Sequence, residues 1–246
     1  MEVQPLYNKD CETVVKNVSE VSKEMKTSER IRTRILAANG NFFANSNIAE
    51  YIEEGEIEEL KIEVEERVAD LLRSLIIDID NDHNTKGTAR RVAKMYLDEV
   101  FSGRYQPMPV ITEFPNHKHL DEIYTLGPIH FKSACSHHFA EIEGQVWVGV
   151  HPSDKIVGIS KIARLVAWVA KRPQIQEEAT MILADQLEEL LAPQGVGVVI
   201  KAKHHCMTWR GVEEEDSNMV TSVVRGTFLK PIIKSEFFEL IKTQSF

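Results

Sequence analysis

The sequence predicts an α+β fold. Apolar residues at helical spacing dominate the chain from residue 57, and alternating apolar residues typical of strands follow later. From residue 123 onward we expect the order strand, strand, helix, helix, strand, strand. The 246 residues suffice for one substantial core with a smaller helical extension.

Residues 1–55 are expected to form a variable, partly disordered arm, because charged residues mix with Asn, Ser and Gly without sustained periodicity. Residues 56–104 are expected to form an N-terminal helical region. Its first helix is predicted to bury one stripe of apolar residues at helical spacing: Ile57, Leu60, Val64, Val68, Leu71 and Leu75. A second helix is expected to begin at a capping Thr88 and to stop near Ser102.

Residues 105–246 are expected to form the main domain. In one predicted strand, Val146, Val148 and Val150 alternate with other residues, which indicates one apolar face. The expected strands are Ile123–Ser133, Ile142–His151, Val196–Cys206 and Met219–Phe228. The expected helices are Ser160–Lys171, one that begins after Pro173 and runs to about Leu191, and Lys234–Lys242.

The overall composition argues against several classes of protein. A net charge of −9 argues against a general nucleic-acid surface, and the acidic runs are typical of solvated faces. No apolar run approaches the roughly 18 residues that span a bilayer, and the acidic start is unlike a secretory signal. Three cysteines, an odd number, argue against a disulfide framework and favour a reducing, cytoplasmic compartment.

Two clusters of cysteine and histidine offer metal ligands. Cys135 and His138 are three residues apart, as in a common zinc half-site. The second cluster, His204-His205-Cys206, ends the predicted strand Val196–Cys206. If side chains alternate along that whole strand, His204 and Cys206 share one face. A Cys/His/Cys set would leave a fourth position open for water, as catalytic zinc sites do. Buried thiols without a metal are the alternative interpretation.

Basic residues at helical spacing are candidates for binding phosphate. Lys161 and Arg164 lie on one face near the start of a predicted helix, where the helix dipole favours anions. Arg210 follows the second cysteine cluster closely, and Arg91 with Lys94 forms another basic pair. A solvated basic face is the alternative interpretation for each pair.

Glu177 opens the second predicted helix of the main domain. A carboxylate can accept hydrogen bonds from both N1–H and the 2-amino group of guanine, a donor pair that adenine lacks. A glutamate in the first turn of a helix also favours the helix dipole, which is the alternative reason for its presence.

Taken together, these segments resemble the GTP cyclohydrolase I family. They appear in the order and at the spacing of that family and cover about residues 57–245. The segments that carry the resemblance are Arg91–Tyr96, Ala134–His138, Gly158–Lys161, Arg172–Glu177, and His204–Met207 with Arg210-Gly211.

The resemblance implies a tunnelling fold, in which an antiparallel four-stranded sheet is backed by two helices. It also implies a homo-oligomer in which five units close a barrel and two pentamers stack into a decamer. Active sites would then lie at subunit boundaries.

The resemblance further implies one zinc ion per subunit, held by Cys135, His138 and Cys206. His137 and His204 would be the acid/base pair, and GTP the substrate. The residues implied to bind GTP are Lys161, Arg164 and Arg210 at the triphosphate, Arg91 and Lys94 from a neighbouring subunit, Glu177 assisted by Gln176 at the guanine, and Ser160 lining the pocket. The implied reaction opens the imidazole ring of guanine, releases formate and forms 7,8-dihydroneopterin triphosphate.

The chain departs from the family pattern at a few positions. Ser136 stands where the family usually has Glu, which removes a charge beside the implied metal site. Ala140-Glu141-Ile142 and Glu178 also differ from the usual residues. Two other readings therefore stay open: another tunnelling-fold enzyme, such as a pterin synthase or a deazaguanine reductase, or a catalytically idle paralogue that acts as a zinc-stabilised binding protein.

Overall fold

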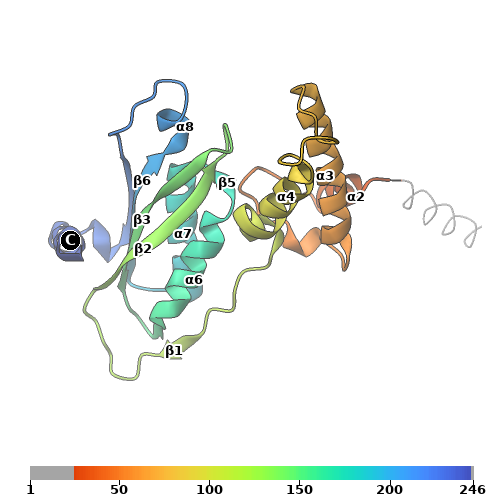
Figure 1. The fold of residues 1–246 in the computed structure, drawn as a ribbon. Coiled ribbons are helices and arrows are strands. Elements are labelled where there is room, and N and C mark those ends of the chain that lie inside the picture. Colours follow the sequence, from red (N-terminus) through yellow and green to blue (C-terminus); the bar gives the residue numbers. More distant parts are fainter. Residues whose placement is uncertain (1–24, 245–246) are drawn as a thin grey trace, which may run out of the picture. The chain divides into compact units, whose positions relative to one another are not determined.

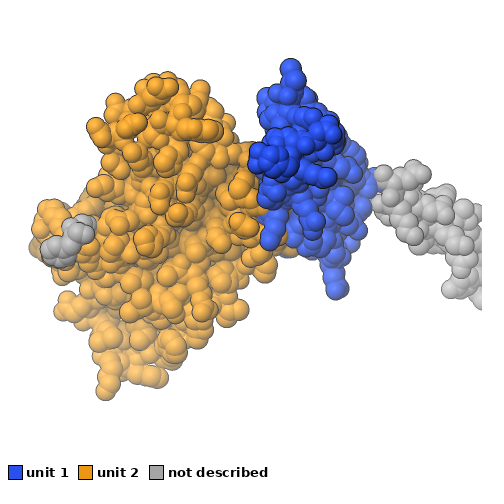
Figure 2. Space-filling model, viewed as in Figure 1, with its two compact units in different colours: residues 1–42, 50–94 blue, residues 43–49, 95–246 orange. Residues whose placement is uncertain are grey.

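The computed structural model describes residues 25–244, and Figure 1 shows their path. They divide into two compact units (Figure 2). Unit 1 holds the described residues up to Phe42 together with Glu50–Lys94, and unit 2 holds Phe43–Ala49 together with the chain from Met95 onward. Among the described residues, no helix has both the length and the apolar character needed to cross a membrane.

The described part of unit 1 contains the helices α2 (Thr27–Ala37), α3 (Glu56–Ser74) and α4 (Thr88–Lys94). Ile31 and Ile35 of α2 and Leu60 of α3 are buried, because both helices carry apolar residues at helical spacing. A short 3-10 turn, η1 (Ala49–Tyr51), precedes α3. The first turn of α3 carries three glutamates, which the positive end of the helix dipole stabilises.

The predicted helix from residue 57 is present as α3, but its apolar stripe is buried only in part. Leu60 is buried, whereas Leu71 and Leu75 are 58% and 61% exposed. Thr88, which was expected to cap the next helix, is its first residue. After α4 the backbone widens into a π-helical turn, η2 (Met95–Val100), before the short α5 (Ser102–Tyr105).

The arm expected over residues 1–55 contains regular structure that the sequence pattern did not indicate. α2 forms there because its few apolar residues pack against α3, although its overall composition is polar. Residues 1–24, the remainder of that expected arm, lie outside the described residues. The expected division into residues 56–104 and 105–246 stays a prediction; the two compact units separate after Lys94.

Unit 2 contains the predicted α+β arrangement. Its main sheet has the strand order β5-β2-β3-β6-β7, and all pairs are antiparallel except β5 with β2. A second, two-stranded sheet pairs β1 with β4. The strands are β1 (Glu113–Pro115), β2 (Tyr124–Cys135), β3 (Glu141–His151), β4 (Lys155–Val157), β5 (Pro173–Gln174), β6 (Gly195–His204) and β7 (Met219–Gly226).

Two long helices, α6 (Ile159–Ala170) and α7 (Gln176–Leu191), cover one face of the main sheet (Figure 1). The alternating residues Val146, Val148 and Val150 of β3 point into this layer and are fully or almost fully buried. The helix predicted to begin after Pro173 starts at Gln176, because Pro173 and Gln174 pair with β2 as β5.

The opposite face of the sheet is covered by the C-terminal helix α9 (Pro231–Gln244), which follows the 3-10 turn η3 (Thr227–Leu229) (Figure 1). Phe237 of α9 is fully buried against Trp147 and Phe228. Gly149 and Gly197 lie opposite each other in β3 and β6, and a Cβ atom on either would come within 3 Å of Phe237. These glycines therefore make room for the aromatic ring.

We expect Glu56→Gln to loosen unit 1. Glu56 is buried and pairs with Arg30 and Arg34. Burial opposes its ionisation, but hydrogen bonds from the Glu53 backbone and both arginines outweigh burial and lower the pKa of its carboxyl. Hydrogen bonds to charged groups contribute about 1.5–3 kcal/mol each, so we expect α2 and α3 amides to open about 2 kcal/mol more easily at pH 7. The exchange rates of these amides, followed by hydrogen-exchange mass spectrometry, measure this change.

The pH dependence has a definite sign. Because the pKa is lower in the folded than in the unfolded chain, Glu56 stabilises unit 1 above the unfolded value of about 4.3 and loses that effect as pH falls through the folded value. The difference between wild type and Glu56→Gln should therefore shrink in acid. Glu58→Gln is the matched control, because the exposed Glu58 forms a surface ion pair with Lys61. Equal effects of both variants would contradict the prediction.

Candidate metal centre and active site

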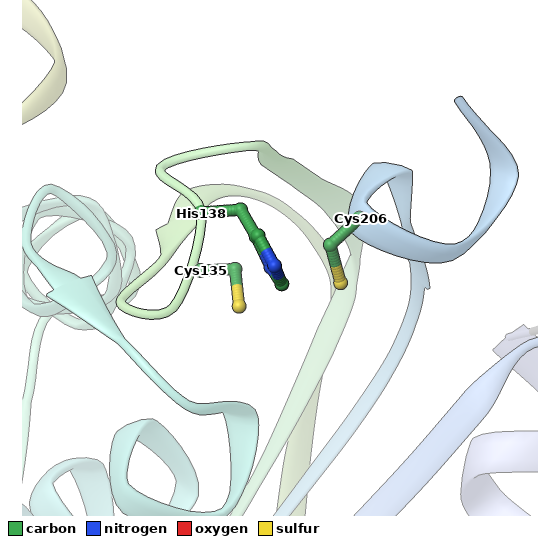
Figure 3. Close-up of side chains that lie close together, drawn as sticks. All are labelled: Cys135, His138 and Cys206. Atoms are coloured by element: carbon green, nitrogen blue, oxygen red, sulfur yellow. The ribbon is translucent and has the colours of Figure 1, made fainter. Parts of the chain in front are cut away.

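Three potential metal ligands converge at one end of the main sheet. The ligand atoms of Cys135, His138 and Cys206 all lie within 4.8 Å of one another (Figure 3). Figure 3 shows the three side chains pointing into a common space from the β2–β3 hairpin and from α8 (His205–Thr208). Cys135 is buried and His138 is exposed, so the space between them is open on one side. Both cysteines are free thiols.

The loop between β2 and β3 holds Cys135 and His138 in a tight turn. The Phe139 amide donates to the Cys135 carbonyl, and the Cys135 amide donates to the Ala140 carbonyl, each at 2.8 Å. Phe139 adopts a left-handed backbone conformation with φ of 53°, which is uncommon for a residue with a large side chain. Its ring packs against Tyr96 and Phe101, which compensates for this strain.

Cys206 reaches the cluster in a different way from the one the strand pattern predicts. β6 ends at His204, and His205 begins the short helix α8. The strand alternation therefore does not extend to Cys206, and the expectation that His204 and Cys206 share a strand face is wrong. Cys206 is brought to the cluster by the first turn of α8, because the chain turns away from the sheet at His205.

The electrostatic surroundings of the cluster are mixed. Burial raises the pKa of the Cys206 thiol, the adjacent Cys135 thiol adds to this effect, and Arg210 acts in the opposite direction. Arg210 Nη1 donates to His138 Nε2 at 3.1 Å, since a guanidinium group can only donate. His137 Nδ1 lies 3.7 Å from Cys135 Sγ. The imidazoles of His137 and His138 and the guanidinium of Arg210 therefore lie near the two thiols.

His204 lies beside this cluster at the end of β6. Its Nε2 atom is 2.8 Å from Oε1 of Gln176, the first residue of α7. Burial lowers the pKa of His204, and the carboxylate of Glu177 opposes that change. Glu177 itself is exposed, whereas Gln176 is fully buried. The first turn of α7 therefore places one carboxylate and one buried amide next to His204.

Lys161 and Arg164, which were predicted to bind the triphosphate, and Ser160, which was predicted to line the pocket, lie away from this cluster. They occupy the start of α6, whereas the end of α6 leads into β5, which pairs with Cys135. Lys161 and Ala170 are nine residues apart in α6, which corresponds to about 14 Å along the helix. Figure 1 shows the start of α6 at the end of the sheet opposite α8. One chain therefore does not bring these three residues to the cluster, whereas Arg210 contacts His138 there.

Arg91 and Lys94 lie in α4 of unit 1, and both side chains are exposed. They are three residues apart on this helix, as their spacing predicted. The Arg91 guanidinium donates to the Asn84 carbonyl and to Thr88.

Sequence reasoning missed three residues that shape the site. Thr180 and Thr221 hydrogen-bond with Gln176 and with each other, although they come from α7 and β7. Phe139 supports the loop between β2 and β3 through its aromatic contacts. No local pattern marks these residues, because the threonines follow ordinary helix and strand spacing and a left-handed conformation of Phe is not encoded by its residue type.

Comparison with known proteins identifies the family. The family sequence model for GTP cyclohydrolase I matches residues 64–242. This chain belongs to the GTP cyclohydrolase I family. It is 37% identical over 187 residues to a GTP cyclohydrolase 1 of Aliivibrio salmonicida, which covers 75% of this chain and 86% of the relative. It is 39% identical over 182 residues to a GTP cyclohydrolase 1 of Vibrio vulnificus, which covers 73% and 83%.

The solved apo structure of the archaeosine synthase QueF-Like also matches, with a TM-score of 0.35 and 16% identity. This match covers 42% of the present chain and 93% of that protein. The likeness is too weak to add to the family assignment. That assignment supports an enzyme of the GTP cyclohydrolase I type with the α+β fold described above.

We expect Cys206→Ser to lose a bound metal ion, because the cluster then keeps only two strong ligands. His204→Ala should retain the metal, since His204 is not part of the three-ligand group. Metal content after dialysis, measured by inductively coupled plasma mass spectrometry, distinguishes the two variants. Loss of metal from His204→Ala together with retention by Cys206→Ser would show that the ligand group is wrongly chosen.

Proposed function

We propose that this chain catalyses the zinc-dependent hydrolytic opening of the imidazole ring of GTP, which releases formate and forms 7,8-dihydroneopterin triphosphate. The observation that carries this proposal is the convergence of Cys135, His138 and Cys206 beside His204, in a chain of the GTP cyclohydrolase I family. The proposal extends the family assignment to a particular reaction and metal.

The donor set suits zinc. Two thiolates and one imidazole are typical ligands of this ion, whereas Mg²⁺ and Ca²⁺ prefer oxygen. The three donor atoms lie within 4.8 Å of one another, close to the separations that bonds of about 2.0–2.3 Å to one ion require, and the exposed side of His138 leaves room for a fourth ligand. A zinc ion held there would supply a water molecule activated for attack near neutral pH.

The two histidines outside the metal set can move protons. His137 lies near Cys135, and His204 lies beside Gln176 and Glu177, so both reach the same end of the sheet. Ring opening requires a proton on the departing ring nitrogen, and a neutral or protonated imidazole can take or return protons near pH 7. The Glu177 carboxylate can accept from N1–H and the 2-amino group of guanine, which orients the base.

We further propose that the triphosphate is held by residues of a second copy of the chain. Lys161 and Arg164 carry the required charge, but they lie at the other end of α6 from the metal ligands of their own chain. Arg210 is the cation adjacent to the cluster. A neighbouring copy that presents its α6 to this cluster would complete the phosphate site, with Arg91 and Lys94 as further candidates.

The edges of the sheet support such an assembly. β7 has a neighbour only on its β6 side, and on its outer side β2 pairs only at Ala134 and Cys135, among residues 25–244. Unpaired strand edges favour addition of another strand. We propose that copies join edge to edge into a ring, in the pentamer and stacked decamer that the family resemblance implies. Because a metal site with two thiol ligands requires reduced cysteines, a cytoplasmic location fits the proposal.

Zinc-replete protein incubated with GTP should release formate and 7,8-dihydroneopterin triphosphate in equal amounts. ATP should not react, because it lacks the N1–H and 2-amino donors that Glu177 would accept. Formate can be measured by a coupled dehydrogenase assay and the pterin by fluorescence after oxidation. Zinc-loaded, assembled protein that binds GTP without releasing formate would instead favour a binding protein of the same fold.

Subunit complementation tests the shared site. Lys161→Ala and Cys206→Ser should each lose most activity when expressed alone. Chains of the two variants that assemble together should regain about one quarter of wild-type activity. With random mixing, about one site in four combines the intact metal ligands of a Lys161→Ala chain with the intact α6 of a Cys206→Ser chain. Lys161→Ala with Arg164→Ala is the matched control, since both changes affect the same half and should not complement. No recovery in a verified mixed oligomer would overturn the shared site.

A further inference from the structure

Gln176 is a buried amide whose polar atoms are all engaged. Its side chain has no exposed surface. Nε2 lies 3.0 Å from the Ile200 carbonyl, 3.2 Å from the Met219 carbonyl and 3.0 Å from Thr221 Oγ1. Oε1 lies 2.8 Å from His204 Nε2. No polar atom of this side chain is left to contact a guanine base.

A directed chain of hydroxyl groups supports this orientation of the amide. Thr180 Oγ1 donates its single proton to the main-chain carbonyl oxygen of Gln176, at 2.7 Å. Thr180 Oγ1 must therefore accept from Thr221 Oγ1, which lies 2.7 Å away. Thr221 then has no proton left for Gln176, so its oxygen accepts from Nε2 of the glutamine amide.

The opposite orientation of the amide would be strongly unfavourable. It would direct Oε1 of Gln176 at the carbonyl oxygens of Ile200 and Met219, neither of which carries a proton. Buried oxygens facing each other without a donor incur the full desolvation cost of both groups. The network therefore fixes Nε2 toward the two backbone carbonyls and leaves Oε1 toward His204.

An amide oxygen can only accept a hydrogen bond, so the imidazole nitrogen that faces it must donate. We propose that Gln176 is a positioning residue that holds neutral His204 in the tautomer with its proton on Nε2. The lone pair of the neutral ring is then on Nδ1. The hydrogen bond to Gln176 therefore fixes the orientation of the His204 ring, on which the role of His204 in the proposed function depends.

This assignment differs from the role that the family resemblance implies for Gln176, which is to assist Glu177 in binding guanine. Glu177 is exposed and its carboxylate is available to a ligand, whereas the neighbouring amide is buried. The two adjacent residues of the first turn of α7 therefore point to different partners. The orientation of His204 is set by Gln176, and the base is left to Glu177.

The tautomer can be observed directly in the zinc-loaded protein. Magic-angle-spinning NMR of protein labelled with ¹⁵N-histidine separates protonated from unprotonated ring nitrogens, and His204→Asn identifies the His204 signals. We expect a protonated Nε2 and an unprotonated Nδ1 in the neutral ring. A proton on Nδ1 in the wild type would overturn the proposal, and this measurement requires neither a variant nor activity.

Gln176→Met tests the cause, because it preserves length but removes the accepting oxygen. We expect the His204 signals to shift toward the other tautomer, zinc to be retained, and kcat for GTP to fall about 10- to 100-fold with KM within about twofold, as for other residues that orient a functional histidine. Gln174→Met is the matched control, since Gln174 is equally buried but bonds to Val169 and Ser133, and it should leave the tautomer unchanged.

A raised KM with unchanged kcat in Gln176→Met would make Gln176 a guanine ligand and overturn the assignment. The inference rests on the proposed function only for its kinetic consequence. If the wild type has no GTP turnover, the proposed reaction fails while the NMR result still decides the tautomer. If turnover is present but His204 carries its proton on Nδ1, only the role of Gln176 fails.

Discussion

The antiparallel register of β2, β3 and β6 is the constraint on which the candidate site depends. Ala134 lies opposite Glu141, and Ile142 lies opposite His204, so the end of β2, the start of β3 and the end of β6 meet at one end of the sheet. A slip of one residue would turn the buried valines of β3 toward the wrong face. The energy that fixes the register is therefore core packing under α6 and α7, while its consequence is the position of the thiols and imidazoles.

Buried polar side chains lie near the same end of the sheet. Gln174 and Gln176 are both fully buried at the junction of β5 and α7, where apolar side chains would have sufficed for packing. Gln176 satisfies every polar atom of its side chain, whereas Oε1 of Gln174 has no hydrogen-bond partner among residues 25–244. A fully satisfied buried amide specifies one geometry, because any rotation leaves an unpaired group in a low-dielectric interior. That property suits a residue that orients His204.

The proposed assembly would resolve two incomplete features at once. Among residues 25–244, the outer edges of the sheet carry unpaired backbone groups, and the cations of α6 lie at the opposite end of that helix from the candidate metal ligands of the same chain. Edge-to-edge association would pair the strands and bring a second α6 to the cluster. If a second copy supplies the cations of the phosphate site, a single chain would hold zinc but bind the triphosphate poorly. Catalysis would then depend on the oligomer for charge and on the single chain for metal and proton transfer.

The sequence by itself determined the elements of the main sheet and the ligand types. Strand alternation predicted β3 and most of β6, and the Cys135–His138 spacing predicted two of the three side chains of the candidate metal site. Those features are local, because side-chain periodicity and one-turn spacing follow from backbone geometry. Helix α2 was not predicted, since its stability comes from packing against α3 and not from its own pattern.

Only the tertiary structure decided how Cys206 reaches the cluster, which predicted ligands share one end of the sheet, and what Gln176 contacts. The strand alternation was extended two residues too far, because the turn at His205 depends on the surroundings of β6 and not on the local sequence. The hydrogen-bond chain through Thr180 and Thr221 joins three segments far apart in the sequence, and no spacing rule reports such a contact. Residue types limited the chemistry that is possible, and the long-range packing of the sheet selected which atoms meet.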